Sequence, residues 1–185
     1  METMLTNKKV AVVVADGFEE TEFTKPVEEL KKTKALVDVI SLKKGKVKSW
    51  DHTMWGKDYT VDKEIAEVDP EEYDALILPG GVMNPDKLRL NTTVVKFVTH
   101  FMQTGKPIAA ICHGPWTLIE TGELRNRTLT SWPSLKTDLS NAGANWVDEE
   151  VVVDENLVTS RKPSDLPMFC AKLIEVISGT GVANP

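Results

Sequence analysis

A cysteine and a histidine stand side by side directly after an apolar run. Cys112 and His113 follow residues 108–111, and Gly114 comes next. A sharp turn from a strand into a helix exposes the side chain at its centre, as in a nucleophile elbow. Free N–H groups at a helix start favour a thiolate, and a neighbouring imidazole can serve as its general base. The pattern predicts a reactive, low-pKa thiol at Cys112; the alternative is a small buried hydrophobe, the usual role of free cysteine.

A pair of glycines follows another apolar run. Gly80 and Gly81 come after residues 75–79, and glycine allows a close approach of the backbone to a ligand. The N–H groups of Gly81 and His113 would stabilise an oxyanion. Gly80 and Trp132, the latter in a loop before a proline, are expected to line the same cleft.

A short acidic segment contains the candidate carboxyl group. Glu19 lies in the loop after the first apolar run. If it is partly buried near the thiol, its pKa is raised and it donates a hydrogen bond to the sulfur. Glu20 and Glu22 are expected to be surface residues at a helix start.

The elements that must position these loops alternate along the chain. Strands are predicted at 9–15, 36–42, 75–78, 107–111, 128–131, 151–153 and 157–160, and helices at 21–32, 91–104, 114–121, 135–141 and 165–178. This alternation predicts an α/β fold with a mainly parallel sheet covered on both faces, to which the last two strands add an antiparallel hairpin. Residues 43–68 are predicted to form turns and short strands. Ligands of open α/β sheets bind beyond the carboxyl ends of the strands, where the three loops would meet.

Composition sets further limits. The 185 residues are expected to form a single domain, 1–185, and a net charge of −6 argues against nucleic-acid binding. No apolar run is long enough to span a membrane, and no secretory signal is recognisable at the start of the chain. Two cysteines form no disulfide framework, so a reducing, cytoplasmic location is expected. No clustered Cys/His pattern predicts a metal site, and no cofactor is expected.

The remaining histidines and the second cysteine are assigned no chemistry. His52 lies in the irregular segment and His100 lies opposite the apolar stripe of its predicted helix. Both are expected to be exposed. Cys170 falls on the apolar stripe of the last helix and is expected to pack in the core.

Six stretches of the sequence match a known family. They are ADGFEETE (15–22), ALILPGG (75–81), PDKLRLN (85–91), GKPIAAICHGP (105–115), NAGANWVD (141–148) and VVVDENLVTSRKPSDL (151–166). With these motifs, of which AICHGP is the most specific, the chain resembles the PfpI family of the ThiJ/PfpI superfamily, in its general-stress-protein branch. The resemblance implies a flavodoxin-like three-layer sandwich of the class I glutamine amidotransferase type.

The same resemblance implies roles and an assembly. Cys112 would be the nucleophile, His113 its partner and Glu19 the carboxyl that tunes the thiol. Members with a complete triad take an acidic residue from a neighbouring subunit, and Asp86 occupies that place here, which implies a homodimer or a larger homo-oligomer. Some members carry Glu at this place, and some branches have His or Tyr where this chain has Trp132.

Two functions remain open from the sequence. In the first, Cys112 attacks an electrophilic carbonyl of a peptide, a dicarbonyl or a glycated adduct, with His113 as base. In the second, the protein is a redox-sensing or protective stress protein in which Cys112 is oxidised and Glu19 binds the product. Glutamine amidotransfer is disfavoured, because the distant His and Glu that it requires do not follow Cys112.

Overall fold

A seven-stranded sheet forms the centre of the computed structural model, which describes residues 3–180. Its strand order is β11-β12-β8-β7-β1-β3-β6. The bounds are β1 Lys9–Val13, β3 Leu36–Ser41, β6 Lys63–Glu64, β7 Ala75–Leu78, β8 Ile108–Ile111, β11 Val151–Asp154 and β12 Leu157–Ser160. All neighbours are parallel except β11 and β12, which form the predicted antiparallel hairpin.

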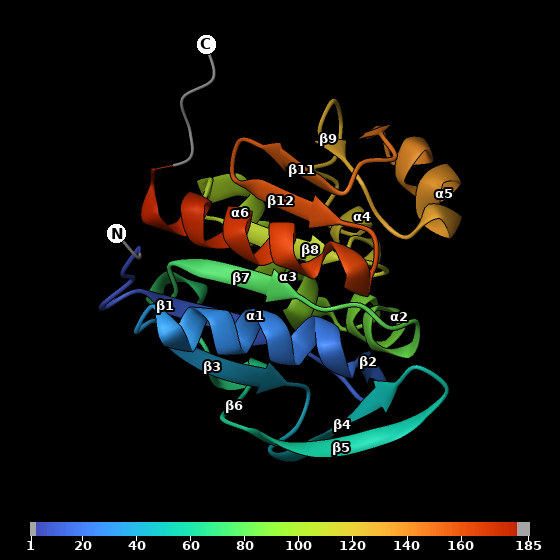
Figure 1. Ribbon diagram of the computed structural model, residues 1–185. Coiled ribbons are helices and arrows are strands. Elements are labelled where there is room, and N and C mark those ends of the chain that lie inside the picture. Colours follow the sequence, from blue (N-terminus) through green and yellow to red (C-terminus); the bar gives the residue numbers. More distant parts are fainter. Residues whose placement is uncertain (1–2, 181–185) are drawn as a thin grey trace.

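Helices cover both faces of this sheet (Figure 1). On one face lie α1 Glu20–Lys32 and α6 Leu166–Ser178, which pack against each other. The other face carries α2 Met83–Arg89, α3 Thr92–Thr104, α4 Trp116–Ile119 and α5 Lys136–Asn141. Alternate residues of β1 belong to the two cores, Val10 and Val12 to one and Ala11 and Val13 to the other. Burial on both faces explains why this strand is almost uniformly apolar, and the predicted three-layer α/β fold is confirmed.

The segment 43–68 is more regular than predicted. It contains a long antiparallel hairpin, β4 Gly45–Asp51 and β5 Met54–Val61, and the short strand β2 Phe18–Glu19 pairs with β4. Tyr59 of the hairpin packs edge-on against Phe18 and Phe23. Most other side chains of the ribbon face solvent, so its sequence lacks the apolar alternation that identifies a strand.

Two helix predictions near the site are corrected. The helix expected at 114–121 is the four-residue α4, which starts at Trp116 after a turn, and α2 was not predicted at all. Pro26 lies inside α1. The remaining elements are β9 Thr128–Leu129, β10 Asn145–Trp146 and four 3-10 turns at Ile65–Glu67, Pro70–Glu72, Pro133–Leu135 and Pro163–Asp165. Within residues 3–180, no helix combines the length and apolar character needed to cross a membrane.

Candidate active site

The backbone at Cys112 forms a strained elbow at the end of β8. Its φ is +61°, a left-handed conformation that is uncommon for residues other than glycine. The Cys112 N–H donates to the carbonyl of Ser160 at 3.0 Å, and its own carbonyl accepts from the N–H of Trp132 at 2.9 Å. Gly114 completes the turn, because a Cβ there would lie 2.3 Å from the carbonyl oxygen of Leu78. The surrounding strands and loops thus impose the conformation that exposes the middle of the turn.

His113 is in direct contact with the thiol. Its Nδ1 lies 3.3 Å from Sγ of Cys112, and its Nε2 lies 3.4 Å from Oγ of Ser134. The ring stacks on Trp132 with centroids 6.2 Å apart and planes 22° from parallel. Burial lowers the pKa of His113, so the imidazole is neutral at physiological pH and can accept a proton.

The carboxyl group beside the thiol belongs to Glu22, not to the predicted Glu19. Glu22 is fully buried on the packed face of α1, which it shares with Phe23 and Pro26. Burial, followed by the negative charge of Glu19, raises its pKa to about 8. The sequence-based assignment of Glu22 to the surface is wrong, because α1 begins at Glu20 and its first turn directs residue 22 inward.

Glu22, Gly80 and Cys112 pack tightly together. A Cβ on Gly80 would lie 2.2 Å from Oε2 of Glu22 and 2.6 Å from Cβ of Cys112, so only glycine fits between them. The Cys112 side chain and the Gly80 backbone lower the pKa of Glu22. Neither carboxyl oxygen has a hydrogen bond of ordinary geometry, so these are close approaches rather than aligned bonds. In its protonated form Glu22 can donate to the sulfur; the role predicted for Glu19 is thus available to Glu22.

Glu19 lies on β2 and is bound elsewhere. Its Oε1 is 2.9 Å from Nδ1 of His52, at the tip of the β4–β5 hairpin. That carboxylate, through its hydrogen bond and its charge, raises the pKa of the exposed imidazole. Glu20 accepts hydrogen bonds from Oγ of Ser49 and, at 3.0 Å, from the N–H of Lys57, so it anchors the hairpin to α1.

Opposing influences act on the Cys112 thiol. Burial and the negative charge of Glu22 raise its pKa, whereas the backbone N–H groups of Gly81 and His113 lower it. The net direction is upward, which contradicts the low pKa expected from a helix start. The main cause is burial of the thiol, and α4 begins only at Trp116, so no long helix starts at Cys112 to offset it. The backbone N–H groups of Gly81 and His113 lie close to the sulfur. That they form an oxyanion hole stays a prediction.

The thiol opens into a cavity of about 530 Å³. Its wall is formed by Gly17, Glu19, Glu22, Trp50, His52, Gly81, Val82, Met83, Cys112, His113, Trp132 and Pro163. Trp132 lines it as predicted, while Gly80 is buried behind the thiol instead. Asp86 lies on the exposed side of α2, outside the cavity wall. Sequence reasoning missed Trp50 and His52, which reach the cavity only through the pairing of β2 with β4.

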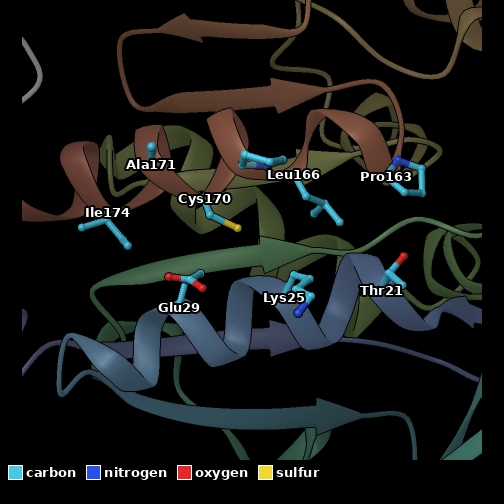
Figure 2. Close-up of a pocket in the computed structure, with 9 residues that line it drawn as sticks. Thr21, Lys25, Glu29, Pro163, Leu166, Cys170, Ala171 and Ile174 are labelled. Atoms are coloured by element: carbon cyan, nitrogen blue, oxygen red, sulfur yellow. The ribbon is translucent and has the colours of Figure 1, made fainter.

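A second, larger cavity lies between α1 and α6 and measures about 740 Å³. Figure 2 shows Thr21, Lys25 and Glu29 of α1 facing Leu166, Cys170 and Ile174 of α6 across it. Cys170 is 5% exposed, and burial raises the pKa of its thiol to about 12. None of the polar groups that surround Cys112 lines this groove.

The fold and the elbow define an α/β protein with a single cysteine at the carboxyl edge of its sheet. Residues 8–176 match the model of the DJ-1/PfpI family, and the chain belongs to that family. It is 44% identical over 172 residues to "Protein/nucleic acid deglycase 2" of Escherichia coli, covering 92% of this chain and 98% of the relative. It is also 44% identical over 163 residues to YraA of Bacillus subtilis, which is named as a candidate cysteine protease, covering 88% of this chain and 94% of the relative.

Solved structures agree with this assignment. A two-domain protein of Anabaena variabilis, with a DJ-1/ThiJ/PfpI-like and a ferritin-like domain, is similar with a TM-score of 0.87 and 39% identity, over 97% of this chain and 50% of that one. DJ-1beta of Drosophila melanogaster is similar with a TM-score of 0.83 and 32% identity, over 93% of this chain and 91% of that one.

Proposed function

We propose that the protein is a cysteine-dependent, hydrolase-like stress protein that acts on small carbonyl compounds or their adducts. One observation carries the proposal. The Cys112 sulfur lies 3.3 Å from the His113 imidazole, at an elbow that opens into a cavity. A volume of about 530 Å³ is in the range of small-molecule sites. The deglycase name of the Escherichia coli relative favours a dicarbonyl or glycated substrate, and the name of YraA keeps a peptide as the alternative.

The proposed chemistry follows from the positions of the polar groups. Sγ of Cys112 adds to the carbonyl carbon while its proton passes to Nδ1 of His113. The electron pair of the C=O π bond moves to oxygen, which the N–H groups of Gly81 and His113 stabilise. Return of the proton to that oxygen gives a hemithioacetal. Neutral Glu22 keeps a second negative charge away from the sulfur during the attack.

Turnover assays test this function directly. Consumption of methylglyoxal, release of amine from its glycated adducts and cleavage of a fluorogenic peptide are measured for the wild type, Cys112→Ser and Cys170→Ser. We expect Cys112→Ser to lose at least about a thousandfold in turnover, as nucleophile removal does in other hydrolases. Cys170→Ser should retain activity. Full activity of Cys112→Ser would refute the proposal.

The redox alternative uses the same sulfur. Peroxide would oxidise Cys112 to sulfenic or sulfinic acid, with the peroxide as oxidant and water as the product. The favouring observation is Glu22, whose protonated carboxyl could donate to a sulfinate oxygen, a role first assigned to Glu19. Intact-mass analysis after peroxide treatment distinguishes the two: an oxidised Cys112 with no turnover on any carbonyl substrate supports the redox function.

We propose with this function a cytoplasmic homodimer or larger homo-oligomer in which Asp86 reaches the partner's site. Asp86 is exposed on α2, next to the loop that carries Gly81, and is free to meet a second copy. An acidic group near the imidazole would orient His113 and raise its basicity. That residues 1–185 form one domain also stays a prediction, since residues 1–2 and 181–185 lie outside the described part of the chain.

Mixing variants tests the shared site. Asp86→Ala should lower turnover several-fold and leave alkylation of Cys112 nearly unchanged, because orienting the base differs from exposing the sulfur. Heterodimers of Asp86→Ala with Cys112→Ser should regain activity, because one site in each would hold both wild-type groups. A monomer in solution, or no recovery after verified subunit exchange, would leave Cys112 and His113 as a dyad.

A further inference from the structure

Three side chains with metal-binding atoms meet at the rim of the cavity. Within residues 3–180, Glu19, Asp51 and His52 form a group whose ligand atoms all lie within 4.8 Å of one another. Nδ1 of His52 is 2.9 Å from Oε1 of Glu19 and 3.5 Å from Oδ1 of Asp51. Two ligands bound about 2.0–2.1 Å from a tetrahedral zinc ion are separated by roughly 3.3 Å. The two distances to His52 lie close to this value, and the carboxylate oxygens of Glu19 and Asp51 lie within 4.8 Å of each other, so a modest adjustment of exposed side chains would bring the three atoms around one ion.

The backbone holds these side chains in place from two paired strands. Glu19 is on β2, whose register sets it opposite Trp50 of β4, and Asp51 ends that strand. His52 occupies the hairpin tip with φ +55°, and its carbonyl accepts a hydrogen bond from the indole of Trp50 at 2.9 Å. The tight turn therefore fixes the adjacent Asp51 and His52 relative to Glu19.

We propose that Glu19, Asp51 and His52 bind a divalent transition-metal ion, with Zn²⁺ as the preferred ion, at the rim of the active-site cavity. Two carboxylates and one imidazole offer a net charge of −2 when the histidine is neutral, and this donor set suits Zn²⁺. Glu19 and His52 line the same cavity as Cys112, so three protein ligands leave a fourth position for water or a substrate oxygen. The sequence shows no such site, because residue 19 is far from residues 51–52 along the chain.

The competing explanation is an ordinary surface ion pair. His52 and Asp51 are largely exposed, whereas Glu19 is not, with only 12% of its side chain accessible. A second pair in this chain serves as a control: Nε2 of His100 lies 3.7 Å from Oε1 of Glu71. His100 is only 18% exposed, so the expectation that it is exposed is wrong. That histidine faces one carboxylate at longer range. If any histidine beside a carboxylate bound zinc in this protein, both the His52 and the His100 sites would contribute to the measured zinc binding.

Zinc titration separates these explanations. Full-length protein is stripped with a chelator and titrated with Zn²⁺ at a pH at which imidazole is neutral, by calorimetry and by competition with a chromophoric chelator. We expect one equivalent to bind. His52→Gln and Asp51→Asn should each weaken this binding by about tenfold or more, as loss of a ligand does, while His100→Gln should not change it. Both altered ligands are exposed, so the variants should fold.

Cys112→Ser distinguishes this site from the thiol. X-ray absorption of the zinc-loaded protein should show nitrogen and oxygen ligands without sulfur, and Cys112→Ser should bind zinc as tightly as the wild type. Loss of binding in Cys112→Ser would place the ion on the thiol and overturn the proposal. Equal affinity in His52→Gln, or no saturable binding at all, would also overturn it. Because the measurement needs no turnover, it stands or falls separately from the proposed function.

Discussion

Within residues 3–180, Cys112 and Cys170 each line a cavity, and of the two sulfurs only that of Cys112 has an imidazole in contact with it. Cys112 and Cys170 are 9% and 5% exposed, and burial raises the pKa of both thiols. The groove at Cys170 is the larger, about 740 Å³ against 530 Å³. Neither burial nor volume therefore distinguishes a reactive cysteine from a packing one.

What differs is the surroundings of the sulfur. Cys112 sits at a left-handed elbow beside an imidazole, a buried carboxyl and two backbone N–H groups. Cys170 lies in the middle of α6, where the backbone N–H and C=O groups bond within the helix. A functional thiol here is thus defined by polar groups that converge on it.

Replacing the buried carboxyl should change how stability depends on pH. The pKa of Glu22 is about 8 in the folded chain and 4.5 as its ordinary value, so ionisation opposes folding. Stability from this group is fully present below pH 4.5 and is lost as pH rises to about 8, by about 5 kcal/mol at 1.36 kcal/mol per unit. Glu22→Gln stays neutral. The wild type should therefore lose unfolding free energy relative to Glu22→Gln between pH 5 and pH 8, as measured by denaturant titration.

Two variants make that comparison specific. Glu19→Gln removes a cavity-lining carboxyl that is not packed against the thiol, so it should keep most of the wild-type pH dependence. The opposite outcome is that the unfolding free energies of wild type and Glu22→Gln change equally with pH between pH 5 and pH 8. That result would mean that Glu22 ionises in the folded protein with little loss of stability.

This misassigned carboxyl shows what a sequence can and cannot predict. The strands were recognisable because burial on both faces leaves long apolar runs, as in β1 and β8. Cys112, His113 and Gly81 were found because they directly follow such runs. Glu22 is expected at the surface from its charge at a helix start, whereas the first turn of α1, which begins at Glu20, directs it inward. The hairpin tip with His52 reaches the site through long-range strand pairing, for which the local sequence gives no signal.

Removing the imidazole should reduce catalysis with little effect on the fold. His113→Ala eliminates the proposed proton acceptor 3.3 Å from the sulfur, and general-base catalysis contributes about a hundredfold or more. Turnover should fall by about that factor, whereas His100→Ala should retain wild-type activity. Steady-state kinetics with the substrate found for the wild type gives the answer. Equal loss in both variants would point to destabilisation instead of lost base catalysis.

Neutralising Glu22 should also lower the pKa of the Cys112 thiol. Glu22→Gln removes the negative charge that raises the pKa of Cys112 and keeps an N–H donor in its place. The thiol pKa should fall by about one unit or more, which ultraviolet absorbance of the thiolate can follow in a Cys170→Ser background. A higher pKa in Glu22→Gln would instead show that the carboxylic proton of Glu22 stabilises the thiolate.

The difference between the two cysteines is tested most directly by mapping their alkylation. The intact protein is treated with a mild alkylating agent across a range of pH, and the modified residue is located by mass analysis at partial conversion. We expect Cys112 to be modified first at every pH and Cys170 to react only when the protein unfolds. Modification of Cys170 at an equal or greater rate in the folded protein would contradict this expectation.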